Sequence, residues 1–396
     1  MNEPRARSDA LEAWAFAAGA PGCPTTLVLV PRAFLVQALG AVIRIDGSAL
    51  TDEAWAATRS AWQDAAAEPA AALAPATTVV AQGGFPAQAM LTGLSSEVTL
   101  AAIEDRAGEL LMLHAAGLAT TDGRVVALVG PSGRGKTTAS RVLGREFGYV
   151  SDETVAIAAD GTVLPYRKPL SLVENDRLPK VQRSPTELGL RPLPGLPLRL
   201  AALVLLERTD DADPATLHRV GLDEGIAGLA QQASYLGRMS APLHVIASHI
   251  EAVGGVHRIT YSNAQALTPL IHELGAREPD PPRMEGERES TVAPLDSSAA
   301  TGQSIVRWRR IPALDTLTLD EQQLALLVRD DERSARVVVL DGLGPTLWRN
   351  AARPASLAEL VRAAVGAHGE PVGAHAEELV AKSLADLTEA GLLTRL

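Results

Sequence analysis

The sequence predicts a protein of the α/β (α+β) class, in which a sheet domain is followed by a linker and a small α+β module. Three observations predict this order. Short apolar runs alternate with helical patterns in the first 275 residues, a glycine-rich segment follows one of these runs, and a proline-rich segment comes after residue 275. At about 150 residues per domain, a chain of 396 residues has room for two or three domains.

Composition and charge exclude several classes of protein. Hydrophobic residues make up 46% of the chain and charged residues 21%, which is typical of a globular protein. The formal charge of -11 repels nucleic acid and anionic lipid, so neither is expected as a partner. The single Cys23 can form no internal disulfide or zinc site, and we expect an inert thiol. No run approaches the roughly 18 apolar residues that span a bilayer, so we expect a cytoplasmic protein.

Four segments are expected. The first is a mixed α/β lead-in with a helix that carries Trp55 and Trp62 on one face and ends in the alanine-rich stretch 65–74. The second is the sheet domain. The third has four prolines and almost no large apolar side chains, which predicts a disordered linker, and the fourth is the small module. The expected boundaries are 1–100, 101–275, 276–303 and 304–396.

Within the sheet domain, short apolar runs predict buried strands. Ala139, Val142, Leu143 and Phe147 share one face of a predicted helix, as a helix packed on a sheet requires. The helix is expected over Lys136–Phe147, and the strands over Leu110–His114, Val125–Val129, Tyr149–Ser151, Ala201–Leu206 and His257–Tyr261.

The glycine-rich segment Gly130–Thr137 fits the phosphate-loop pattern G-x-x-x-x-G-K-[ST] between a predicted strand and a predicted helix. Its glycines let backbone N–H groups turn inward around an anion, and the helix N-terminus adds its dipole. Lys136 can reach the β and γ phosphates and Thr137 can ligate Mg²⁺, which predicts a site for ATP and Mg²⁺. The residues expected at the nucleotide are Gly130, Ser132, Gly133, Arg134, Gly135, Lys136, Thr137 and Thr138.

Two adjacent carboxylates, Asp152 and Glu153, follow the predicted strand Tyr149–Ser151. Strand ends of such sheets meet at the ligand crevice, so one carboxylate could hold Mg²⁺ while the other accepts a proton. The alternative is a solvated acidic turn. His114 ends a predicted strand and is either structural or close to the same crevice. Arg167 and Lys168 lie between prolines, in a loop that either clamps phosphate or acceptor or is simply exposed.

Together these residues resemble the HPr kinase family of phosphate-loop kinases, whose core is similar to that of phosphoenolpyruvate carboxykinase. The resemblance rests on His114 before the loop, on Ser132 and Gly133 within it, and on the acidic pair after it. It implies that Asp152 activates the acceptor hydroxyl, that Glu153 and Thr137 serve Mg²⁺, and that His114 lies beside the transferred phosphate.

The sequence also departs from that family. The family pair is Asp-Asp, so Glu153 departs from it at the metal position, and Thr138 replaces an acidic residue that often follows the loop. The downstream glycine-rich segment of the bifunctional enzymes has no counterpart. We therefore expect neither reverse phosphorolysis nor HPr itself as the substrate.

The module after the linker resembles winged-helix PqqD-like domains, which recognise leader peptides of ribosomally made, modified peptides by adding a strand to a hairpin edge. The resemblance rests on two predicted strands read as a hairpin, on two later helices and on the ending Ala390–Leu393; Trp348 is expected in the core. The expected strands are Ile305–Ile311 and Ala335–Leu340, and the expected helices are Ser356–Ala367 and His375–Ala390.

The charge of the module favours peptide over DNA as its ligand. Residues 304–396 contain 11 basic and 13 acidic residues, a net charge of -2, and the last predicted helix has only Lys382 against four acidic residues. The sequence therefore predicts an ATP-dependent, Mg²⁺-requiring kinase that phosphorylates Ser or Thr in a modified-peptide precursor. The alternative is a nucleotide-gated scaffold or ATPase that presents the precursor to partner enzymes. The resemblance also allows other biosynthetic enzymes as partners and a homo-oligomer.

Overall fold

A computed structural model describes residues 32–67, 74–174, 177–212, 214–282, 306–330 and 334–396. The N-terminal part has a three-stranded sheet in which β1 and β2 pair antiparallel and β3 adds parallel to β2. The predicted tryptophan helix ends earlier than expected, because Trp62 caps it and inserts, fully buried, into the core under this sheet. These elements are β1 (Ala33–Ala38), β2 (Ala41–Asp46), α1 (Asp52–Ala61), η1 (Gln63–Ala65), β3 (Thr77–Val80) and α2 (Ala87–Asp105).

The central sheet has nine strands in the order β12-β14-β11-β5-β4-β7-β8, with β6 and β13 also paired to β4. The strands β5, β11 and β14 are parallel, and β4 runs antiparallel between β5 and β6. β5 and β6 therefore point the same way and end at the same edge. The strands are β4 (Leu111–Ala119), β5 (Arg124–Val129), β6 (Gly148–Ser151), β7 (Thr154–Ile157), β8 (Val163–Leu164), β11 (Arg199–Arg208), β12 (Thr216–Arg219), β13 (Ala233–Ser234) and β14 (Val256–Tyr261).

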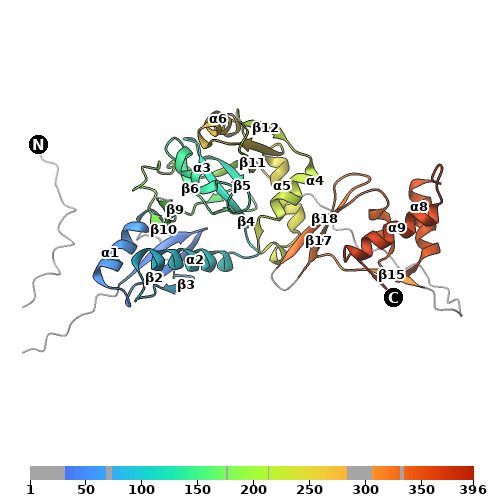
Figure 1. Ribbon diagram of the computed structural model, residues 1–396, viewed down its shortest axis with the longest axis horizontal. Helices are drawn as coiled ribbons and strands as arrows, with labels where there is room; N and C mark the ends of the chain where they lie inside the picture. Colours follow the sequence, from blue (N-terminus) through green and yellow to red (C-terminus); the bar gives the residue numbers. More distant parts are fainter. Residues whose placement is uncertain (1–31, 68–73, 175–176, 213, 283–305, 331–333) are drawn as a thin grey trace, which may run out of the picture.

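Helices cover both faces of this sheet (Figure 1). Apolar residues of α3, η3 and α6 share one core with the sheet, whereas those of α4 and α5 share another. A separate hairpin of β9 and β10 contacts α2. The bounds are α3 (Lys136–Leu143), β9 (Leu170–Glu174), β10 (Arg177–Arg183), α4 (Leu222–Ala230), η2 (Leu236–Arg238), α5 (Pro242–Ala252), η3 (Ala264–Leu267) and α6 (Thr268–Gly275).

The predicted strands of the central sheet are present, each with slightly different ends, but two predicted limits are wrong. The helix predicted to reach Phe147 ends at Leu143, because the carbonyl of Gly144 accepts the N–H of Arg191 instead of continuing the helix. The strand predicted to end at His114 continues to Ala119, because its small residues pair with β5 in the buried centre of the sheet.

The C-terminal part contains two three-stranded sheets rather than the predicted hairpin. Strand β18 pairs with β17, whereas β15 pairs with β19 and with the C-terminal β20. The prediction missed β16 and β17 and so joined two strands that belong to different sheets. The elements are β15 (Arg307–Arg310), β16 (Asp315–Thr318), β17 (Leu324–Arg329), β18 (Ala335–Leu340), α7 (Gly344–Asn350), β19 (Ala355–Ser356), α8 (Leu357–His368), α9 (Ala376–Glu389) and β20 (Leu393–Arg395).

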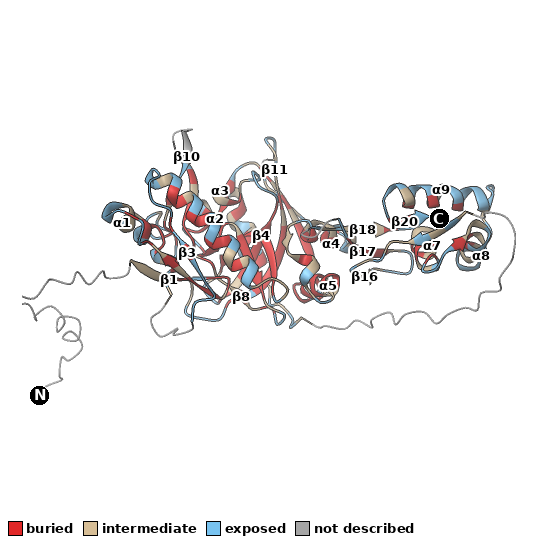
Figure 2. Cartoon of the chain, turned by 90° about the horizontal axis from the view of Figure 1, so that it is seen from below, coloured by how far each residue is buried: buried red, intermediate tan, exposed pale blue. Residues whose placement is uncertain are grey.

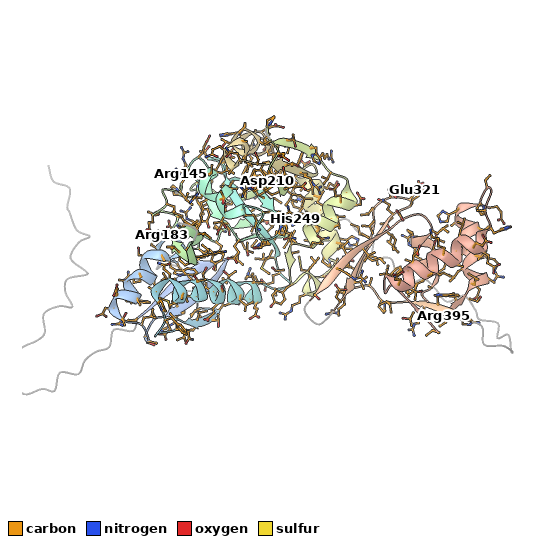
Figure 3. The ribbon with its side chains drawn as sticks, viewed as in Figure 1. Arg145, Arg183, Asp210, His249, Glu321 and Arg395 are labelled. Carbon is orange, nitrogen blue, oxygen red and sulfur yellow. The ribbon has the colours of Figure 1, made fainter. Side chains whose placement is uncertain are left out.

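The sheet β16-β17-β18 lies between two cores. Ala325 and Leu327 of β17 pack in the core of α4 and α5, while Leu324 and Leu326 on its other face pack with the C-terminal helices and the buried Trp348. Figure 2 shows β17 and β18 between α4 and these helices, and Figure 3 labels Glu321 above and Arg395 below the helices. The C-terminal part is therefore packed against the central domain as well as joined to it by the chain.

The structure supports a mixed α+β protein. Residues 283–303 of the predicted linker lie outside the described residues, as does Cys23, so the linker and the four-segment division stay predictions. Among the described helices, none has both the length and the apolar character needed to cross a bilayer.

Candidate functional site

The phosphate loop begins where β5 ends and leads directly into α3. Gly133 and Gly135 have φ angles of +84° and +87°, which favour glycine. At Gly135 a Cβ atom would also lie 2.6 Å from the Tyr261 hydroxyl, so no other side chain fits without a shift. The Tyr261 hydroxyl donates to the Arg134 carbonyl at 2.9 Å and supports the loop from the end of β14.

Lys136 is the first residue of α3 and is 6% exposed. Its Nζ donates to the carbonyl oxygens of Gly130 at 2.6 Å and Pro131 at 2.9 Å, so the ammonium lies across its own loop. Burial lowers the pKa of Lys136 to about 8, although Asp152 and Glu153 act in the opposite direction. An anion in the loop would therefore meet a cation that has no direct carboxylate partner among the described residues.

The other residues predicted at the nucleotide surround this lysine. Gly130 is buried at the end of β5, and Thr137 is half-buried on the first turn of α3. Three side chains are exposed and free to approach a ligand in solution: Ser132, Arg134 and Thr138.

His114 lies in the middle of β4, between the loop and the acidic pair. Its carbonyl accepts the N–H of Gly130 at 3.3 Å, and the next residue, Ala115, donates to the Glu153 carbonyl at 3.1 Å. Burial, together with the Lys136 ammonium, lowers the pKa of His114, so the imidazole is neutral at pH 7. Strand β4 thus brings His114 close to both the loop and the acidic pair.

The acidic pair is held by a buried lysine. Lys168 is 3% exposed, and its Nζ lies 2.9 Å from Glu153 Oε2 and 3.7 Å from Asp152 Oδ1. Burial alone would lower the pKa of Lys168, but the two carboxylates outweigh it and raise that pKa. The Tyr149 hydroxyl donates to Asp152 Oδ1 at 3.0 Å. Asp152 is buried with two partners, whereas the Glu153 side chain is 39% exposed.

Tyr149 is a residue of this site that sequence reasoning missed, and Tyr166 is a second buried tyrosine nearby in the segment that carries Lys168. Burial and the Asp152 charge raise the pKa of Tyr149, which keeps its hydroxyl protonated as a donor. Tyr166 is fully buried two residues before Lys168, and its hydroxyl lies 2.9 Å from Thr99 Oγ1 of α2. A buried tyrosine needs a hydrogen-bond partner. The position of Tyr149 three residues before Asp152 was therefore the feature of the sequence that could have predicted this contact.

The contacts of the Arg167 side chain are with groups other than Asp152 and Glu153. Its guanidinium donates to the carbonyls of Tyr149 at 2.9 Å and Arg191 at 3.1 Å, and forms a largely buried ion pair with Asp64 at 3.2 Å. These contacts join the N-terminal part to the central domain. The side chains of Arg167 and Lys168 both already have partners. A clamp role for either of them stays a prediction.

The oxygen donors at the site fit Mg²⁺. Thr137 and Glu153 offer a hydroxyl and a partly exposed carboxylate, which are the hard ligands that Mg²⁺ prefers, and Mg²⁺ commonly takes one or two protein ligands beside phosphate oxygens. In the part of the chain that the structure describes, no group of three or more His, Cys, Asp or Glu side chains is placed so that it could hold a metal ion by itself. Magnesium here would therefore be held jointly with the phosphates of a nucleotide.

The chain matches no protein-family model, and no curated protein matches it in sequence.

Proposed function

We propose that this protein is an ATP-dependent phosphotransferase that phosphorylates a side-chain hydroxyl, of Ser or Thr, in a ribosomally made, modified-peptide precursor. The observation that carries the proposal is the arrangement around β4, where the phosphate loop with Lys136 adjoins one side of His114 and Asp152 with Glu153 adjoins the other. This arrangement and the loop pattern agree with the resemblance to HPr kinases. A cytoplasmic location goes with this proposal.

The proposed step is a direct transfer. The acceptor oxygen forms a bond to the γ-phosphorus, the bond from that phosphorus to the β–γ bridging oxygen breaks, and ADP leaves. Asp152 takes the proton of the acceptor hydroxyl, and the Tyr149 hydroxyl orients its carboxylate. Lys136 neutralises charge on the β and γ phosphates, and the neutral His114 can donate a hydrogen bond to the transferred group. Magnesium, held by Thr137 and Glu153, would neutralise further phosphate charge.

The C-terminal part would capture the leader of the precursor. The predicted hairpin is absent, so of the resemblance to PqqD-like domains the two later helices and the ending Ala390–Leu393 still support this. A three-stranded sheet whose edge strands, β16 and β18, each pair on one side only among the described strands also supports it. Such edges can accept an added peptide strand. Because this sheet packs against α4 and α5, a captured leader would be held close to the central domain and would raise the local concentration of the acceptor.

A second candidate is a nucleotide-gated scaffold or slow ATPase that presents the precursor to partner enzymes. The ion pair of Lys168 with Asp152 and Glu153 favours this reading, because the carboxylates that would serve the acceptor hydroxyl are already paired with an ammonium.

One experiment separates the two candidates. The protein is incubated with Mg²⁺, γ-labelled ATP and the short precursor peptide encoded beside its gene, and the mass of the peptide is measured. We expect label on the peptide and a mass increase of one phosphoryl group. Label released only as free phosphate supports the ATPase reading and contradicts the kinase.

The variant Asp152→Asn tests the proposed base. It keeps the size of the side chain and loses the proton acceptor, so turnover should fall by about 10²-fold or more with little change in ATP affinity. Steady-state kinetics with the precursor and calorimetry with ATP measure the two effects. Near-normal turnover of the Asn variant would mean that another group takes the proton.

A further inference from the structure

The proposed chemistry lies on one side of the phosphate loop, and a polar cavity lies on the other. His114 and Asp152 belong to β4 and the end of β6, on one side of β5. On the opposite side, β11 and β14 end at Arg208 and Tyr261, which are paired in the register of the sheet. The cavity beside these strand ends has a volume of about 330 Å³.

The direction of the polyphosphate links this cavity to the nucleotide. In a phosphate loop the lysine reaches the β and γ phosphates while backbone N–H groups hold the α and β phosphates. The γ end therefore belongs beside Asp152. The α-phosphate and the nucleoside must extend the other way, past Thr138, which lines the cavity. The volume is at the lower end of the range for small-molecule sites, about 300–1,000 Å³.

The lining of the cavity suits a nucleoside. Arg141 and Arg208 contribute two guanidinium groups, and no ion pair involves either of them among the residues that the structure describes. Such groups stack on aromatic rings and attract phosphate. Gln265 adds an amide group that can donate to and accept from the edge of a base, and Asn263, whose Oδ1 accepts the N–H of Gln265 at 3.0 Å, adds an amide NH₂ that can donate. Tyr261 also lines the cavity, and its hydroxyl supports the loop.

A second groove, of about 290 Å³, lies on the α4 face of the sheet and also touches the loop. Its lining includes the apolar Val129, Leu205 and Leu206, and of its two arginines Arg258 is already paired with Glu224 while Arg134 is exposed. With one such arginine instead of two, this groove offers a bound nucleotide fewer available cations than the cavity at Arg141 and Arg208.

We infer that the cavity lined by Arg141, Arg208, Asn263 and Gln265 is the nucleoside-binding site. The inference rests on the proposed function, because it takes the γ-phosphate to lie beside Asp152. It leaves the opposite side of the loop, at His114 and Asp152, for the acceptor peptide.

Calorimetry with two ligands tests the assignment. Inorganic triphosphate probes the loop alone, and ATP probes the loop and the nucleoside site. Gln265→Trp places a large side chain at the cavity, from a position that is exposed, and should weaken ATP binding at least about tenfold while triphosphate binding stays within twofold. Retained triphosphate binding also shows that the loop of the variant is folded. The matched control is Gln231→Trp, an exposed glutamine on the α4-face groove, which should change neither affinity.

The outcomes separate this inference from the proposed function. If Gln231→Trp weakens ATP selectively while Gln265→Trp does not, the nucleoside occupies the α4-face groove and the assignment is wrong. It is also wrong if both variants bind ATP and triphosphate as the wild type does. A wild-type protein that binds neither ligand contradicts the proposed function itself.

Discussion

Two regions of the candidate site each bury one lysine, and the two ammonium groups differ in their partners. Lys136, in the phosphate loop, donates to carbonyl oxygens only, and burial lowers its pKa to about 8. Lys168, in the segment after β8, contacts the carboxylates of Glu153 and Asp152, and its pKa is raised. Similar burial thus gives opposite shifts, because only Lys168 has counter-charges in direct contact.

This difference indicates different roles for the two regions. A buried cation without a paired carboxylate gains stabilisation when an anion arrives, which supports the proposal that the Lys136 region receives phosphate. A buried cation that already neutralises two carboxylates fixes their positions and has less to gain from a ligand. The region of Lys168 is therefore a support for Asp152 and Glu153.

The largest expected effect comes from removing the cation that has no carboxylate partner. Lys136→Ala should lower phosphate transfer by about 10³-fold and weaken ATP binding, because the ammonium neutralises charge in both the bound and the transition state. Kinetics and calorimetry measure the two losses. Lys180→Ala, at an exposed lysine of β10, is the matched control and should retain wild-type values. A Lys136→Ala protein with full ATP affinity would contradict the role of the loop.

Removing the paired cation should instead affect folding. Lys168→Met leaves Asp152 buried without its counter-charge and should lower the free energy of unfolding by about 3 kcal/mol, measured by urea denaturation. The same change made in an Asp152→Asn protein should cost less, since one of the two unpaired charges is then absent. Equal losses in both backgrounds would mean that Lys168 and Asp152 do not interact.

The charge of Lys136, unlike that of Lys168, should change between pH 7 and pH 9, because the pKa of Lys136 is lowered and that of Lys168 is raised. A group with a pKa of about 8 loses its proton as pH rises, so the protonated fraction of Lys136 falls about tenfold between pH 7 and pH 9. The affinity for inorganic triphosphate should fall by about the same factor, measured by calorimetry at each pH. Lys136→Arg keeps its charge throughout and should remove this dependence. A wild-type affinity that is constant to pH 9 would show that the ammonium keeps its proton.

The smallest expected effect concerns the hydroxyl that orients Asp152. Tyr149→Phe removes one hydrogen bond and should lower the free energy of unfolding by about 1 kcal/mol, with a measurable fall in kcat. The matched control is Tyr166→Phe, which removes the same chemical group. The Tyr166 hydroxyl contacts Thr99 rather than a carboxylate, so this variant should change stability without changing kcat. Equal kcat values for the two variants would mean that Tyr149 has no orienting role.

Much of this site could be predicted from short stretches of the sequence. The phosphate loop is a local feature, because glycine spacing, the following lysine and the flanking strand and helix lie within about twenty residues. Five of the nine strands of the central sheet (β4, β5, β6, β11 and β14) were predicted for the same reason, since a short apolar run between turn residues needs no distant information. The adjacent Asp152 and Glu153 were found because a strand end beside a phosphate loop is a known place for carboxylates.

Tertiary structure alone decided the partners of those residues. Lys168 looked like a cation in a stiff loop, and only the packing of that segment brings it against Glu153 and turns the neighbouring Arg167 toward Asp64. His114 looked like a strand end, but pairing with β5 continues its strand. Likewise, the pairing of β15 with β20 joins segments more than eighty residues apart. Sequence periodicity specifies which side chains are buried, whereas the partner that a buried charge or strand edge meets depends on which distant segments pack against it.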